Sequence, residues 1–165
     1  MNDILVLGVG NLLMQDEGVG IHAIRALEER YQFEPAVDLV DGGTAGLELI
    51  DKLDGREKVL IVDAVDFDLA PGSIVKLGNG QVQSQLKEKM SLHHLGLTDV
   101  LSAAELLDIR PPAIHLIGVQ PDSMEVALEL SPKMRSVFPQ VLEAVVAQLG
   151  EWGVEAVEAT EGIQV

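Results

Sequence analysis

The chain has 165 residues, of which 47% are apolar, so it can bury the core of one domain and is too apolar for a disordered protein. Its 27 acidic and 11 basic residues give a formal charge of −16, which repels a phosphate backbone and makes nucleic acid an unexpected partner. The chain lacks cysteine, an apolar run long enough to span a membrane and a basic signal-peptide region, so we expect a cytoplasmic protein without disulfides or thiolate metal sites.

The first half of the chain alternates between strand and helix patterns. The apolar run at residues 4–7 predicts a buried strand, and a glycine-rich loop then leads into a helix from residue 18 to about residue 31. Residues 37–41 predict a second strand, followed by a helix that Thr44 can cap. The continuous apolar run at 58–62 is typical of a strand covered on both faces.

The second half continues this alternation. Residues 73–77 predict a fourth strand, and a helix is expected from residue 91 to about residue 107. Residues 113–119 predict a fifth strand, and a last helix is expected over 132–150, with a serine cap and proline at its first position. The remaining residues, 155–165, fit either an edge strand or a loose end.

This alternation predicts an α/β protein. We expect a single domain over residues 1–165, built as a three-layer α/β/α sandwich around a twisted sheet of about five strands, mainly parallel or mixed. If the first strand lies between the second and the third, the loops that follow these strands meet at one edge of the sheet, where ligands bind in such folds.

The glycine-rich loop after the first strand favours a cation over a phosphate. Gly8 and Gly10 begin a dinucleotide-binding pattern, but Leu13 stands where the third glycine would be, and Asp16 and Glu17 stand where the phosphate would bind. A helix N-terminus attracts an anion by roughly 0.3–1 kcal/mol. Two like charges about 4 Å apart repel by about 4 kcal/mol at an effective dielectric near 20. A nucleotide site is therefore a weak interpretation.

Four carboxylates follow the first three predicted strands and would gather at the same edge of the sheet. They are Asp16, Glu17, Asp41 and Asp63. Neighbouring carboxylates raise one another's pKa, so a bound cation would stabilise such a group. Each also has a structural explanation, because acidic residues favour helix N-termini and aspartates are common in turns.

A nitrogen ligand is available in the helix expected after Ser91. If Ser91 caps that helix, His93 lies on its apolar face and His94 points towards water. Two carboxylates and one imidazole form a plausible site for a first-row divalent metal such as nickel or zinc. A histidine on an apolar face is also common in protein cores, and we interpret His22 and His115 as structural.

Five motifs follow one another in order along residues 2–150. They are Gly8-Val9-Gly10-Asn11-Leu12-Leu13 with Asp16-Glu17-Gly18, Asp41-Gly42-Gly43-Thr44-Ala45-Gly46, Val62-Asp63-Ala64, Ser91-Leu92-His93-His94-Leu95-Gly96-Leu97, and Gly118-Val119-Gln120-Pro121. In this order and spacing they closely resemble the motifs of the hydrogenase maturation endopeptidases.

The resemblance implies an enzyme that removes the C-terminal extension of a nickel-iron hydrogenase large-subunit precursor after nickel insertion. It implies Glu17, Asp63 and His93 as metal ligands. The nickel would be carried by the precursor, and the enzyme would hold no metal at rest. We expect the enzyme to be a monomer. Asp41 is a further candidate for cleavage or substrate positioning. Whether Asp16, Asp41 or a metal-bound water drives hydrolysis stays open. The alternatives are a non-cleaving chaperone that binds nickel or the precursor and a nucleotide-binding α/β enzyme.

Overall fold

A five-stranded mixed sheet forms the centre of the molecule. The computed structural model describes residues 1–78, 80–82, 84–85 and 97–159. The strands are β1 (Ile4–Val9), β3 (Asp38–Gly43), β4 (Lys58–Ala64), β5 (Ile74–Leu77) and β6 (Ala113–Val119), in the order β3-β1-β4-β6-β5. Only β5, at one edge, runs antiparallel to its neighbour within this sheet. The prediction that the first strand lies between the second and third is therefore confirmed.

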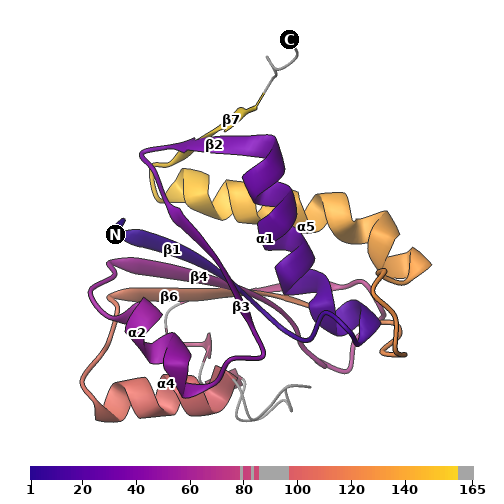
Figure 1. Cartoon of the computed structure of the whole chain (residues 1–165), viewed down its shortest axis with the longest axis horizontal. Coiled ribbons are helices and arrows are strands. Elements are labelled where there is room, and N and C mark those ends of the chain that lie inside the picture. Colours follow the sequence, from indigo (N-terminus) through magenta and orange to yellow (C-terminus); the bar gives the residue numbers. More distant parts are fainter. Residues whose placement is uncertain (79, 83, 86–96, 160–165) are drawn as a thin grey trace.

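Helices cover both faces of the sheet, as the alternating pattern predicted (Figure 1). One face packs against α1 (Val19–Arg30) and α5 (Pro132–Glu151). The other face packs against α2 (Ile50–Leu53) and α4 (Leu97–Leu106). Strands β1, β4 and β6 send alternate apolar side chains to the two faces, which explains their continuous apolar runs. In the part of the chain that the structure describes, no helix is long and apolar enough to cross a membrane.

Several local predictions needed correction. The first helix is preceded by a 3₁₀ turn, η1 (Gln15–Gly18). Thr44 does not cap a helix: after β3 the chain forms the 3₁₀ turn η2 (Leu47–Leu49), which has no side-chain cap and leads into the single helical turn of α2. The predicted helix of residues 91–107 is described only from Leu97 onwards.

A small second sheet forms from the segments that follow the first and last helices, and the sequence pattern indicated only one of its two strands. Strand β2 (Tyr31–Glu34), which was not predicted, pairs antiparallel with β7 (Glu155–Glu158). The tail, for which the sequence fitted either an edge strand or a loose end, is a strand as far as Glu158, but it pairs outside the central sheet. The last helix begins as predicted, because the Ser131 side chain accepts a hydrogen bond from the Met134 N–H.

Helix α1 touches the central sheet through glycine backbone. A Cβ atom on Gly20 would lie 2.3 Å from the Val62 carbonyl oxygen, and one on Gly8 would lie 2.3 Å from the Gly20 carbonyl oxygen. Both glycines are therefore required for the close approach of α1 to β1 and β4. This contact places η1, which immediately precedes α1, against the end of β4.

Gly20→Ala is expected to lower the free energy of unfolding by about 3 kcal/mol or more, because the new methyl group would meet backbone that cannot move aside. Gly150→Ala is the matched control: it lies in α5, and a methyl group there would have no neighbouring atom within 4 Å, so it should leave stability unchanged or raise it by up to about 1 kcal/mol. Urea unfolding of both variants measures the difference. Equal stability of the two would contradict the close helix-to-sheet contact.

Candidate functional site

Asp63 is a fully buried carboxylate near the carboxyl end of β4. It lies on the sheet face that carries Ile61 and Val65, which pack against α2 and α4. Burial raises the pKa of Asp63 well above its usual value, the negative charge of Glu17 raises it further, and a hydrogen bond with the Ala64 backbone acts in the opposite direction. A carboxyl group in this position is costly to ionise, which is unusual for a residue with no more than a packing role.

Glu17 is the second carboxylate of the site. It lies in η1, is half-buried, and is close enough to Asp63 for its charge to act on that group. Its position follows from the local fold, because η1 ends where α1 begins and α1 is held against β4 by Gly20. The structure therefore brings together two of the three residues proposed as metal ligands, which are 46 positions apart in the sequence.

The third predicted ligand, His93, lies outside the described residues, as does its neighbour His94. Leu97, the first described residue after them, is buried in the same cluster as Ile61 and Val65, which flank Asp63 on its face of the sheet. Among the residues that the structure describes, no group of three or more histidine, cysteine or acidic side chains is arranged to hold a metal.

Asp41 lies at the same edge of the sheet but on its surface. Gly8 of β1 pairs with Asp41 on one side and with Val62 on the other, so two strand spacings, about 10 Å, separate Asp41 from β4. Its Oδ1 accepts a hydrogen bond from the Gly43 N–H (3.0 Å), and its Oδ2 lies 3.9 Å from an Arg25 nitrogen. It lines a shallow cavity of about 210 Å³ together with Arg25. Asp41 is therefore accessible from solvent near the Glu17–Asp63 pair.

Asp16, the other predicted catalytic candidate, is fully buried, and its carboxylate accepts hydrogen bonds from other parts of the chain. Its Oδ2 accepts hydrogen bonds from the N–H groups of Asp122 (2.9 Å) and Ser123 (3.0 Å) and from the Ser131 hydroxyl (2.7 Å). Its Oδ1 accepts one from the Ser131 N–H (2.8 Å). A carboxylate with four such donors and no exposure cannot take a proton from an attacking water. This geometry does not fit the catalytic role proposed for Asp16 and fits the anchoring of a loop.

The sequence pattern missed the segment that Asp16 anchors. Ser131 was recognised only as a helix cap, but its hydroxyl both accepts from Met134 and donates to Asp16. The donors from Asp122 and Ser123 are backbone N–H groups, which every non-proline residue carries. No side-chain pattern could have revealed them.

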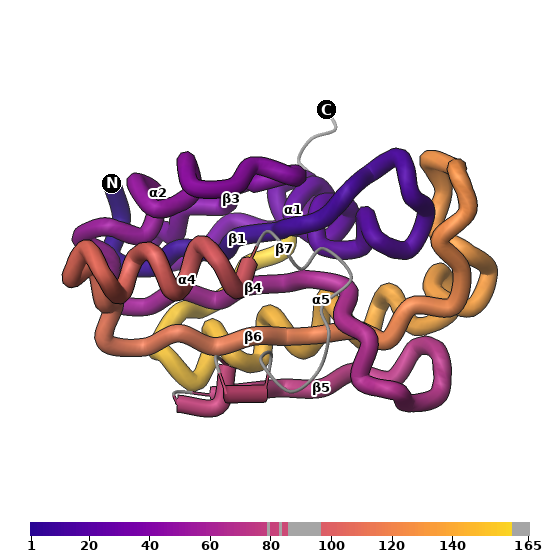
Figure 2. Tube along the Cα trace, turned by 90° about the horizontal axis from the view of Figure 1, so that it is seen from below, coloured from indigo at the N-terminus to yellow at the C-terminus, as the bar shows by residue number. Residues whose placement is uncertain are grey.

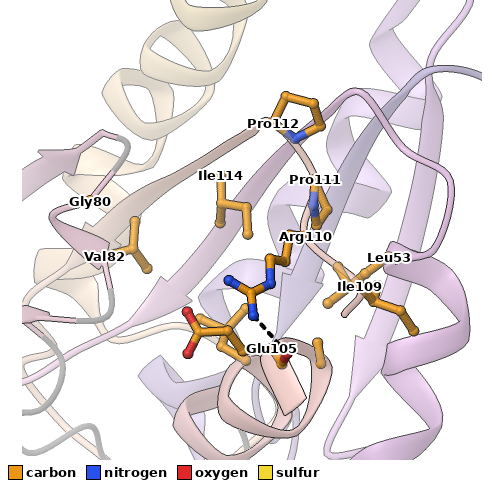
Figure 3. A pocket seen from close by; sticks show the side chains of 11 residues that line it. Leu53, Gly80, Val82, Glu105, Ile109, Arg110, Pro111, Pro112 and Ile114 are labelled. Carbon is orange, nitrogen blue, oxygen red and sulfur yellow. Dashed lines mark hydrogen bonds between the residues drawn. The ribbon is translucent and has the colours of Figure 1, made fainter. Parts of the chain in front are cut away.

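A second cavity, of about 230 Å³, lies at the other end of the sheet (Figure 3). It is lined mainly by apolar side chains of α2, α4, the start of β6 and the loop between α4 and β6. Arg110 lies at this cavity and donates a hydrogen bond to the Glu105 carbonyl oxygen (3.3 Å). Because it is at the amino ends of the parallel strands, this cavity is separate from the acidic pair.

The fold and the site define a three-layer α/β protein with an acidic pair at the carboxyl ends of two adjacent parallel strands, Asp63 within β4 and Glu17 in the turn after β1. A family model described as HycI, hydrogenase maturation protease, matches residues 21–148. The chain is 43% identical over 155 residues to the hydrogenase 2 maturation protease of Escherichia coli K12, covering 93% of this chain and 94% of the relative. It is 37% identical to the hydrogenase expression/formation protein HupD of Rhizobium leguminosarum bv. viciae, and the match covers 98% of this chain and 81% of that relative.

The structural comparison agrees. The hydrogenase maturating endopeptidase HybD from Escherichia coli superposes with a TM-score of 0.87 and 42% identity, covering 96% of this chain and 98% of that one. The chain belongs to the hydrogenase maturation protease family and is an endopeptidase of that family. This membership favours the protease over the chaperone and the nucleotide-binding enzyme considered from the sequence.

Proposed function

We propose that this endopeptidase removes the C-terminal extension of a nickel-iron hydrogenase large-subunit precursor, and that it recognises the nickel carried by that precursor through Glu17, Asp63 and His93. The observation that carries the proposal is the fully buried Asp63 carboxyl group near the carboxyl end of β4, which lies against the turn η1 that carries Glu17. The family membership supports the reaction, and the pair of carboxylates supports the recognition of a cation.

The donor set suits a divalent ion that arrives with the substrate. Ionising the buried Asp63 beside Glu17 is costly, and a divalent ion between the two carboxyl groups would offset that cost. Carboxylate oxygens with an imidazole nitrogen are ligands that first-row metals accept. The nickel would fix the scissile bond and polarise its carbonyl group. In this scheme, a precursor without nickel is not cleaved, because it cannot engage the acidic pair.

Of the two aspartates considered for the cleavage step, Asp41 is the one that a peptide can reach. It is exposed, whereas Asp16 is enclosed by its four hydrogen bonds. We propose that Asp41 positions the peptide or activates water, as an alternative to a water bound to the nickel. The Arg25 side chain beside it can bind a carbonyl or carboxylate oxygen of the substrate.

Asp41→Asn is expected to slow processing by about 10-fold or more while changing the free energy of unfolding by less than about 0.5 kcal/mol, because the side chain is exposed and its ion pair with Arg25 is long. Steady-state cleavage and thermal melting measure the two effects. The matched control is Asp54→Asn, at an exposed position after α2, which should change neither quantity. A fully active Asp41→Asn variant would remove this residue from the reaction.

The proposal is tested with a nickel-loaded precursor and mass spectrometry of its C-terminus. The wild-type protein should shorten the loaded precursor and leave the nickel-free precursor intact. Glu17→Gln and His93→Ala should each lose activity, whereas His94→Ala should keep it. Full cleavage by the first two variants would overturn the site assignment, and loss of activity only in His94→Ala would transfer the imidazole role to that residue. A wild-type protein that binds the loaded precursor without shortening it would overturn the proposed reaction.

A further inference from the structure

Four exposed apolar side chains gather on two loops beside the candidate site. Leu13, Met124, Val126 and Leu128 are 59%, 37%, 82% and 59% exposed, and we refer to them as the apolar loop patch. The loop before α1 and the loop between β6 and α5 lie side by side at one end of the molecule (Figures 1 and 2). Single exposed leucines and valines are common in proteins, but such a group on two adjoining loops marks a contact surface.

The two loops are paired through their backbones, so the patch is continuous. The Ala127 N–H donates to the Leu13 carbonyl oxygen (3.0 Å), and the Gln15 N–H donates to the Ala127 carbonyl oxygen (3.0 Å). Met14 and Ala127 thus form a parallel bridge, which places Leu13 next to Val126. The apolar side chains of both loops therefore form one surface.

The patch is also held in place before any partner binds. The four hydrogen bonds to the Asp16 carboxylate fix the second loop at both of its ends, at Asp122 and Ser123 and at Ser131. The Nε2 atom of His22 in α1 lies 3.1 Å from the Leu128 carbonyl oxygen. A surface fixed in this way loses little conformational entropy when a partner covers it.

The position and charge of the patch indicate which partner would cover it. Leu13 is four residues before Glu17, so the patch adjoins, along the chain, the turn η1 that carries one of the proposed nickel ligands. Residues 10–18 and 121–131 together contain five acidic residues and no lysine or arginine. A second copy of this chain, with its charge of −16, would be repelled. The surroundings suit an apolar surface that is flanked by lysine or arginine side chains.

We propose that the apolar loop patch docks the hydrogenase large-subunit precursor, through an apolar surface with flanking basic residues next to the precursor's nickel site. This inference rests on the proposed function and adds where the substrate is held outside the cleavage site. The patch determines substrate affinity, and the acidic pair determines whether the bound precursor is cleaved.

The test is a double variant, Val126→Ser with Leu128→Ser, assayed with the nickel-loaded precursor. Losing the burial of one such side chain changes an equilibrium by about 10-fold, so KM should rise at least about 10-fold with kcat changed less than about twofold. The matched control is Leu106→Ser with Leu107→Ser, which are 88% and 63% exposed at the far end of α4. This control should leave KM unchanged.

A binding measurement keeps this test separate from the proposed function. Biolayer interferometry of the loaded precursor on immobilised enzyme should show the same rise in Kd for the patch variant, whether or not cleavage follows. Leu13→Ser provides an independent variant on the other loop, and thermal melting verifies that each variant is folded. An unchanged Kd for both folded patch variants, or an equal rise in the Leu106/Leu107 control, would overturn the proposal. So would a dimer of the enzyme in sedimentation that the patch variant dissociates.

Charge provides a second readout of the same surface. Glu125→Gln should weaken precursor binding at low salt and reduce the dependence of Kd on salt, because it removes one of the acidic groups beside the patch. Glu143→Gln on α5, away from the two loops, is the control and should keep the wild-type salt dependence. Tighter binding of the precursor to Glu125→Gln would contradict a basic partner surface.

Discussion

Asp63→Asn is expected to reduce processing of the nickel-loaded precursor by at least about 100-fold and, at the same time, to raise the melting temperature of the enzyme. The activity falls because an amide cannot replace a charged carboxylate at the proposed nickel site. The stability rises because Asp63 is fully buried and its ionised form is destabilised by that burial and by the charge of Glu17. A gain of at least about 2–4 °C is expected, which corresponds to about 1 kcal/mol in a domain of this size.

The gain in stability should depend on pH in a defined direction. Because the folded-state pKa of Asp63 lies well above the ordinary value of 3.8, the folded protein binds this proton more tightly than the unfolded chain. The stabilising contribution of the protonated group is complete below the unfolded pKa and is lost as the pH rises through the folded pKa. The difference in melting temperature between Asp63→Asn and the wild type should therefore widen as the pH rises above 3.8, until the folded-state pKa is passed.

Two matched variants separate the effects on activity and on stability. Glu17→Gln should lose activity with a smaller change in melting temperature, because Glu17 is only half-buried. Asp54→Asn, at an exposed position after α2, should change neither quantity. Wild-type activity in Asp63→Asn would exclude this residue from the site, and a temperature difference that stays constant with pH would contradict the buried charge.

Asp16→Ala is expected to lower the free energy of unfolding by about 3–5 kcal/mol, because four buried donors would lose a charged acceptor. At about 2–4 °C per kcal/mol this is a fall in melting temperature of roughly 10 °C. Asp16→Asn should be nearly as unstable, since an amide offers only one acceptor oxygen and turns its N–H groups towards other donors. Both variants should also lose activity, because the loop that carries Glu17 is no longer held.

The control for this prediction is Asp122→Ala, which keeps the backbone N–H that donates to Asp16 and removes only an exposed side chain. Its melting temperature should match that of the wild type. A catalytic role for Asp16 leads to a different result, namely an inactive Asp16→Asn protein with an unchanged melting temperature. Thermal melting and cleavage assays on the three variants therefore distinguish an anchoring carboxylate from a general base.

The central fold could be predicted because its signals are local in the sequence. The run 58–62 is apolar at every position except its first, as a strand covered on both faces requires, and the acidic residue that follows it predicted the edge where ligands bind. Strand β2 was missed because its four residues continue directly from α1 and pair with β7, whose residues are more than 120 positions away. Thr44 was misassigned because a threonine after glycines resembles a helix cap whether or not a helix follows.

The site could be predicted in part, for a similar reason. Topology alone brings the ends of β1 and β4 together, so the proximity of Glu17 to Asp63 followed from the strand order. The strand order did not predict that the adjacent residues Asp16 and Glu17 have different environments. Asp16 is buried and Glu17 is half-exposed, and this difference depends on the loop at 122–131, which has no periodic pattern. The hydrogen bonds that distinguish them come largely from backbone groups.

The distance along the chain between Asp16 and its donors has a consequence for biosynthesis. During translation the residues up to about 120 leave the ribosome first and can form β1, α1 and β4, but the donors at Asp122, Ser123 and Ser131 are still missing. The loop that carries Glu17 is completed only when the start of α5 has emerged. A chain that ends before residue 122 is therefore expected to contain the parallel strands of the central sheet and to lack proteolytic activity, because nothing holds the Asp16 carboxylate and the loop beside it.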